Sequence, residues 1–152
     1  MKCDNDQKVG TSLLQAVQTT LMEMTFIDVI PSEDSSEIGD TNVIFISFND
    51  PFHGGLLMKM PKDCKMKIVE NIHGSNWDSL SGDEIDDCLL EVLNVLAGNF
   101  LKFYCGEERN FNMSFPQILF EEREIPHREQ YNPYYFDAEG VVFEAAVCIG
   151  ES

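Results

Sequence analysis

Two polar residues with chemically useful side chains, Glu91 and Asn94, lie three residues apart in an otherwise apolar stretch. At this spacing in a helix, the side chains are neighbours on one face. A carboxamide such as that of Asn94 can accept a hydrogen bond from water through its oxygen, while its N–H₂ group donates to another oxygen. The pair is therefore the candidate working site of the chain, facing solvent or whatever docks there.

The helical periodicity around the pair separates an apolar side from a polar one. Turning about 100° per residue groups Asp87, Glu91, Asn94 and Gly98 opposite the core side, which is formed by Ile85, Cys88, Leu89, Val92, Leu93, Leu96 and Phe100. Asn is a mediocre residue for a helix interior, because its amide competes for backbone groups. Gly98 would cost roughly 1 kcal/mol relative to Ala if it is internal, but a small residue leaves room for an approaching backbone. The alternative is a solvated stripe in which Gly98 and Asn99 begin a C-cap.

Local signals predict the elements that position this face. Ser81 and Glu84 form the S-x-x-E pattern of a capping box, which begins the longest helix, running to about Phe103. Before it, Pro61 begins a shorter helix at its first position and Gly74 ends it. The spacing predicts another helix over 11–24, after a polar lead-in at 1–10.

The remaining segments alternate in the manner of strands joined by short turns. Such neighbours pair antiparallel, so the fold class is α+β, a mostly antiparallel sheet with helices packed on it. Residues 13–21 resemble 89–97, with Gln15 and Gln18 where the second stretch has Glu91 and Asn94, and this resemblance suggests a duplicated helix-plus-strands unit. The expected strands are 26–30, 42–48, 55–60, 111–115 and 118–120, then a hairpin of 131–136 with 141–149, and 121–130 is expected to be an exposed connection.

Composition restricts the class of protein. The chain has 152 residues, which suits one domain spanning 1–152. Its 27 Asp and Glu against ten Lys and Arg give a net charge of −17, which disfavours nucleic acid and anionic membranes as partners. Five cysteines without a CxxC pair, and three scattered histidines, indicate neither a disulfide framework nor a metal site. With a polar N-terminus and no apolar run of about 18 residues, the expected location is the cytoplasm.

Four stretches, in order, resemble the CheC/CheX family of chemotaxis phosphatases. The stretch from Asp87 to Asn99 (DCLLEVLNVLAGN) is similar to the E-x-x-N helix of that family. Residues 54–74 resemble the strand, proline and helix before the motif, 112–116 (NMSFP) resemble the strand ending in proline after it, and the first helix fits as well. One intact motif, with Gln15 and Gln18 in the first helix, is similar to the CheX branch. The family helix usually continues N-M-I-A-G, whereas Asn94 is followed here by Val-Leu-Ala-Gly, a change on the core side.

The resemblance implies a function and a division of roles. It implies that the chain hydrolyses the aspartyl phosphate of a CheY-type response regulator, with Asn94 orienting the attacking water. Glu91 would form a salt bridge to the regulator's lysine, and Asp87 and Gly98 would also face this phosphorylated receiver domain. The divalent metal would be the regulator's own, so no cofactor is expected, and CheX-type proteins are commonly homodimers.

Two other readings of the same residues stay open. The chain could be a non-catalytic adaptor that binds a receiver domain or another signalling protein. It could also be a dimerising structural domain, in which case Glu91 and Asn94 would be buried in its own interface.

Overall fold

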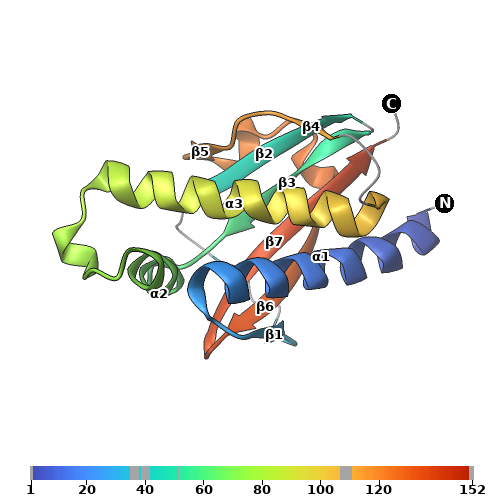
Figure 1. Cartoon of the computed structure of the whole chain (residues 1–152). Helices are drawn as coiled ribbons and strands as arrows, with labels where there is room; N and C mark the ends of the chain where they lie inside the picture. The colour runs from blue at the N-terminus through green and yellow to red at the C-terminus, as the bar shows by residue number, and fades with distance from the viewer. Residues whose placement is uncertain (1, 35–37, 39–41, 51, 107–110, 151–152) are drawn as a thin grey trace.

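An antiparallel seven-stranded sheet forms the centre of the protein in the computed structural model (Figure 1), which describes residues 2–34, 38, 42–50, 52–106 and 111–150, without the side chains of 2–6. The strand order is β1-β6-β7-β3-β2-β4, and β5 also pairs with β2. The strands are β1 (Val29–Pro31), β2 (Val43–Asp50), β3 (His53–Lys59), β4 (Asn112–Met113), β5 (Gln117–Leu119), β6 (Asn132–Ala138) and β7 (Val141–Gly150). The expected α+β class with a mostly antiparallel sheet is confirmed.

Three helices cover one face of this sheet. Helices α1 (Lys2–Thr25) and α3 (Gly82–Cys105) lie side by side across it, running in opposite directions, and α2 (Lys62–His73) packs near one end of the pair (Figure 1). Alternate residues of β2 show why the sheet has two packed sides: Ile44 and Ile46 belong to the core under the helices, whereas Val43 and Phe45 face the other side.

The strand order supports the possible duplication. If β1, β2 and β3 are matched with β4, β6 and β7 respectively, the strand order read from one edge of the sheet is equivalent to the order read from the other edge. Helix α1 precedes the first set of strands, as α3 precedes the second. The two helices that the repeat relates are also the two that pack against each other, where the Asn99 side chain donates a hydrogen bond to the Thr20 hydroxyl at 2.9 Å. The arrangement is that of two helix-plus-strands units related by a pseudo-twofold axis.

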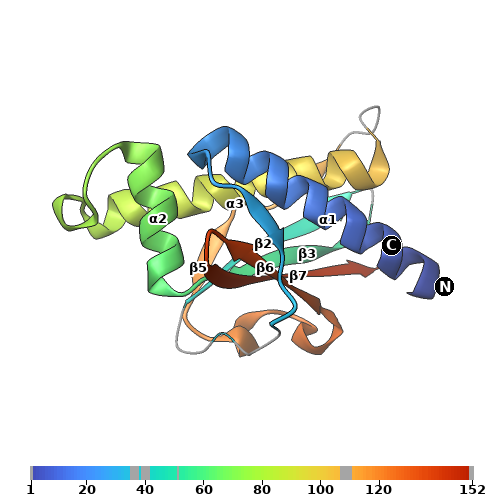
Figure 2. The ribbon, with the colours of Figure 1, turned by 90° about the horizontal axis from the view of Figure 1, so that it is seen from below.

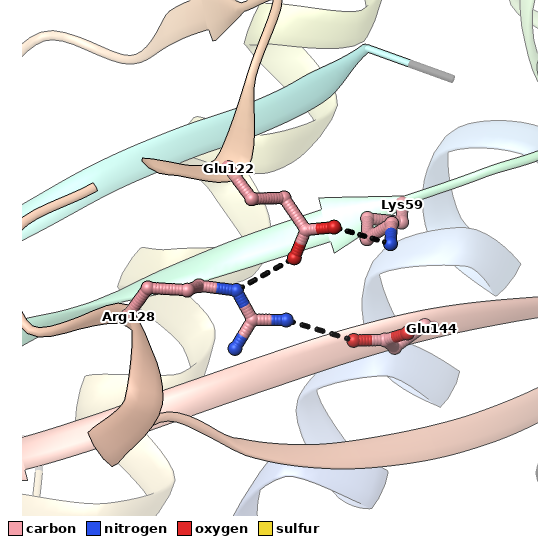
Figure 3. A network of polar contacts seen from close by, with 4 residues as sticks. All are labelled: Lys59, Glu122, Arg128 and Glu144. Carbon is pink, nitrogen blue, oxygen red and sulfur yellow. Dashed lines mark hydrogen bonds and ion pairs between the residues drawn. The ribbon is translucent and has the colours of Figure 1, made fainter. Parts of the chain in front are cut away.

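The far face of the sheet is covered by residues 121–130, which form two short 3₁₀ turns, Glu122–Glu124 and Arg128–Gln130 (Figure 2). Ion pairs attach this segment to the sheet (Figure 3). The Glu122 carboxylate pairs with the buried Lys59 of β3 and with Arg128, each at 2.7 Å. Arg128 also lies 3.5 Å from the carboxylate of the buried Glu144 of β7. The expectation of an exposed connection holds for most of these side chains, but it missed the anchoring of the segment to the sheet. Lys59 and Glu144 are directly paired across the strands, and charged groups in such a position need partners, which the segment supplies.

The electrostatics of this network follow from its geometry. Burial would raise the pKa of the Glu122 carboxyl, but hydrogen bonds from Lys59 and Arg128, and their charges, outweigh burial and lower that pKa. A second apolar cluster, with Ile125 and Tyr131 packed on β2, β3 and β7, lies under the same segment. Residues 121–130 are thus part of the folded structure on the far side of the sheet.

Several expected boundaries shift in the structure. Helix α1 begins at Lys2 and not at residue 11, because Val9 is buried in the core and Lys8 lies over the Tyr104 ring at 4.8 Å, contacts that sequence periodicity alone does not show. Pro61 is the N-cap of α2 rather than its first residue, while Gly74 ends the helix in the left-handed conformation as expected. Strands β1 and β4 are shorter than expected, and β5 has the expected length but begins one residue earlier. The sequence between the first two expected strands, 32–40, has the composition of a loop and lies partly outside the described residues.

Helix α3 is also the one helix, in the part of the chain that the structure describes, long and apolar enough by length and composition alone to cross a membrane. Its apolar residues pack against α1 and the sheet. Core helices of globular proteins meet the same criterion, so the feature is weak evidence for a membrane span.

Candidate functional site

Helix α3 is fixed at its start by the expected capping box. The Ser81 hydroxyl accepts a hydrogen bond from the Glu84 backbone N–H at 3.1 Å, and the Glu84 carboxylate accepts one from the Ser81 N–H at 2.9 Å. The bond from the Ser81 backbone is the main cause of a lowered pKa at the Glu84 carboxyl. Because the buried residues of α3 fix its rotation against α1 and the sheet, the positions of its outward side chains are fixed as well.

The outward face of α3 presents the residues predicted from the sequence. Glu91, Asn94 and Asp87 are exposed, and Gly98 is half-buried. Within the part of the chain that the structure describes, neither Glu91 nor Asn94 uses its side chain in a hydrogen bond or ion pair. Their exposure is therefore confirmed, and both groups are available to a partner. The alternative of a C-cap at Gly98 and Asn99 is wrong, because the helix continues to Cys105.

A groove of about 420 Å³ runs along the Asn94 side of the helix. One wall is made by α3 through Asp87, Leu90, Glu91 and Asn94. The other is the segment 113–116, which comes from the end of β4 and the turn before β5. The resemblance singled out 112–116 only as a strand, and its place beside Asn94 required the tertiary structure.

The second wall holds its own polar groups firmly. The Ser114 N–H donates to the Ser47 carbonyl at 2.9 Å, and the Ser47 N–H donates to the Ser114 hydroxyl oxygen at 3.0 Å. The Ser114 hydroxyl also donates to the Phe115 carbonyl at 3.2 Å. The Ser114 side chain is thus bonded to the backbone, and the polar side chains of the groove that remain available are Asn94 and the two carboxylates, Asp87 and Glu91.

A second groove, of about 320 Å³, lies on the other side of Glu91. Its walls come from the ends of α1 and α2 and from the start of α3, and they are mostly apolar, with Met24, Ile72 and Cys88 among them. Asp87 and Glu91 border both grooves, so they form a ridge between them. A docking partner would therefore meet an acidic ridge flanked by two recesses.

The pseudo-twofold mate of the site is built differently. Gln15 is exposed on α1, but the Gln18 amide, which corresponds to Asn94, donates to the Val29 carbonyl of β1 at 2.9 Å. The carboxamide of the first unit therefore holds its own strand. Only the second unit presents both side chains of the pair to solvent.

Other candidate chemistry is sparse. No group of three or more His, Cys, Asp or Glu residues able to hold a metal ion occurs among the described residues. Cys64, Cys88, Cys105 and Cys148 form no disulfide, and burial raises the pKa of Cys64 to about 12. A cleft of about 490 Å³ on the far face is bordered by His53 and His127, away from the Glu91 ridge.

Comparison with known proteins assigns this arrangement to a family. Residues 43–139 match the family described as chemotaxis phosphatase CheX. A chain in the CheX–CheY–BeF₃–Mg²⁺ complex of Borrelia burgdorferi is 18% identical, the match covering 93% of this chain and 97% of that chain, with a TM-score of 0.73. The chemotaxis protein CheX of Vibrio vulnificus is 16% identical over 93% of this chain and 95% of that chain, with a TM-score of 0.74.

More distant architecture is shared too. A chemotactic CheC-like protein of Shewanella oneidensis is 18% identical over 98% of this chain and 99% of that chain, with a TM-score of 0.65. No curated protein sequence matches the chain. At these identities the solved structures establish the fold, while the family match covers the Glu91 ridge and both walls of the Asn94 groove.

Proposed function

The chain belongs to the CheX family of chemotaxis phosphatases, and from that premise we propose that it hydrolyses the aspartyl phosphate of a CheY-type response regulator. The observation that carries the proposal is the exposed, unpaired Asn94 beside Glu91 at the edge of a groove within the family match. The complex of the similar Borrelia burgdorferi protein, which contains CheY with BeF₃ and Mg²⁺, supports a receiver domain as the partner.

Asn94 performs the chemical role in this proposal. Aspartyl phosphate is hydrolysed when water attacks phosphorus in line with the departing carboxylate, and catalysis depends on positioning and charge neutralisation. The Asn94 oxygen accepts a hydrogen bond from the attacking water, while its N–H₂ group donates to a phosphoryl oxygen. No intrachain bond has to break first, because the amide makes none within the described residues.

Glu91 performs the docking role. A carboxylate next to a phosphoryl group repels it, so Glu91 is suited to a positive group of the partner, namely the lysine of the receiver's active site. This ion pair sets the position of α3 over the phosphate and hence the position of Asn94. Asp87, on the same ridge, adds negative charge toward a basic rim, and Gly98 leaves space for the partner's backbone.

The other parts of the proposal follow from the same interaction. The divalent metal belongs to the receiver, so this chain binds no cofactor. The protein acts in the cytoplasm, where receiver domains are phosphorylated, and as a homodimer whose interface leaves the Glu91 ridge uncovered.

Phosphate release from a phosphorylated receiver domain tests the proposal. The wild-type chain should accelerate release, and Asn94→Ala should reduce the rate about a hundredfold or more, the size of effect seen when one positioning group is lost, while binding to a BeF₃⁻-activated receiver persists. Glu91→Ala should weaken both binding and turnover. Gln15→Ala, at the equivalent exposed position of α1, is the matched control and should change neither.

Binding without any release, across several receivers, would favour the adaptor instead. Absence of both binding and release would leave the structural domain as the better description. In that case Glu91 and Asn94 should become protected when the protein dimerises.

A further inference from the structure

Among the described residues, Phe115 is the most exposed of the large apolar side chains, at 92% of its full accessible surface. It precedes Pro116 in the segment 113–116, so it stands on the wall of the groove that faces Asn94. Exposing a phenyl ring to water is unfavourable, and this ring lies beside the candidate site, where a docking partner could cover it.

The backbone around Phe115 is held on both sides. Ser114 is bonded to Ser47 of β2 through its N–H and its hydroxyl. Two residues later, Gln117 pairs with Phe45 of the same strand. Pro116 fixes its own φ and restricts Phe115 to extended conformations. The ring is therefore presented from a rigid wall, and little backbone entropy is lost when a partner covers it.

We propose that Phe115 is an apolar anchor that packs against an apolar surface of the receiver domain next to its phosphorylated aspartate. The proposal rests on the proposed function, because it is the receiver seated on Glu91 and Asn94 that reaches the opposite wall. Asn94 and Phe115 line the same groove from its two walls, so a domain that fills the groove over Asn94 is placed to cover Phe115 as well. The occupant is a receiver with an apolar side chain or shallow recess at that place.

The anchor complements the acidic ridge. Exposed charges such as Asp87 and Glu91 mainly speed the encounter and select its orientation. Buried aromatic side chains at the centre of an interface carry much of its binding energy, and they act chiefly on the dissociation rate. Phe115 would thus set the dissociation rate of the receiver and the choice among receivers, whereas Asn94 would act in the hydrolysis of the phosphate.

Phe120 provides a matched control. It is also a phenylalanine, 78% exposed, and it follows β5 closely, but it does not border the groove. Replacing either ring by Ala removes a surface side chain, so both variants should unfold at the wild-type temperature. The two substitutions differ only in whether the ring faces the proposed partner.

The test measures the affinity of both variants for a receiver domain carrying Mg²⁺ and BeF₃⁻, together with the steady-state kinetics of phosphate release. Phe115→Ala should raise Kd and KM about tenfold, with kcat at saturating receiver unchanged. Phe115→Leu, which keeps part of the apolar surface, should fall between Phe115→Ala and the wild type, and Phe120→Ala should match the wild type. The dissociation rate should account for most of the loss.

Two results would overturn the inference. One is an unchanged Kd for Phe115→Ala, and the other is an equal loss in Phe120→Ala. Kd is measured without hydrolysis, so the role of Phe115 in binding is tested separately from catalysis. A receiver that binds but is not dephosphorylated would contradict the proposed function, and its Kd for Phe115→Ala would still test the anchor. Release that depends on Asn94 and is indifferent to Phe115 defeats the anchor alone.

Discussion

Gly98→Ala should change stability and docking in opposite directions. Gly98 lies in the interior of α3, and a Cβ built on it would meet no heavy atom within 4 Å. Nothing in the fold therefore requires glycine there, and the helix should gain about 1 kcal/mol from alanine. For a chain of this size that corresponds to a melting temperature higher by about 2–4 °C.

The effect on docking depends on what the partner brings to this place. If the receiver's backbone packs on Gly98, one turn beyond Asn94, the new methyl group holds the two surfaces apart. Overpacking of a fitted contact costs about 1–3 kcal/mol, so Kd for the activated receiver should rise about fivefold or more. Gly82→Ala, at the opposite end of α3 where a Cβ also meets nothing, is the control and should leave Kd unchanged.

Thermal unfolding and a binding titration on the same samples decide the matter. A stabilised protein with unaltered Kd would show that Gly98 does not contact the receiver, and the assignment of this residue to the docking surface would fall. A destabilised protein would refute the simpler claim that space around Gly98 is open.

Three further predictions concern the fold that supports the site. Glu122→Ala leaves the buried Lys59 without this carboxylate and should lower the free energy of unfolding by about 2–3 kcal/mol, measured by urea denaturation. Arg123→Ala, which breaks an exposed ion pair with Glu121, should cost under about 0.5 kcal/mol in the same experiment. Because the folded pKa of Glu122 is lowered, its stabilisation is complete above the ordinary Glu pKa and is lost as the pH falls through the lowered one, and this acid-side loss should shrink in Glu122→Ala. Burial raises the pKa of Cys64 to about 12, so iodoacetamide at pH 8 should alkylate this thiol only after unfolding, as peptide mass mapping would show. Ser81→Ala removes one half of the capping box and should cost about 1 kcal/mol in the same urea experiment.

Local chemistry explains which parts of the fold the sequence could predict. The capping box at Ser81, the left-handed Gly74 and the two-residue turn of Glu139 and Gly140 between β6 and β7, where both φ angles are positive, are each determined by a few adjacent residues. Helices α2 and α3 and the last hairpin were accordingly predicted close to their true bounds. The outward position of Glu91 and Asn94 followed from periodicity alone.

The errors fall where distant residues decide the structure. The first turns of α1 are polar in sequence, but the side chains of Val9 and Lys8 pack on other elements. The segment 121–130 is rich in charged residues, a composition typical of an exposed loop. The sequence alone does not show that Lys59 and Glu144 lie beneath it. The second wall of the groove was missed for the same reason, since nothing local indicates that 113–116 lies opposite Asn94.

The difference between Gln18 and Asn94 shows how one fold can present one site from two similar units. Both carboxamides stand at corresponding places of paired helices, and each faces the first strand segment that follows its helix. In the first unit the strand β1 lies close enough for its Val29 carbonyl to accept the Gln18 amide. In the second unit the corresponding bond between a side chain and the backbone is made by Ser114, whose hydroxyl oxygen accepts from the Ser47 N–H of β2. The wall at 113–116 is therefore held by bonds that do not involve Asn94, and the Asn94 amide is left available to a partner.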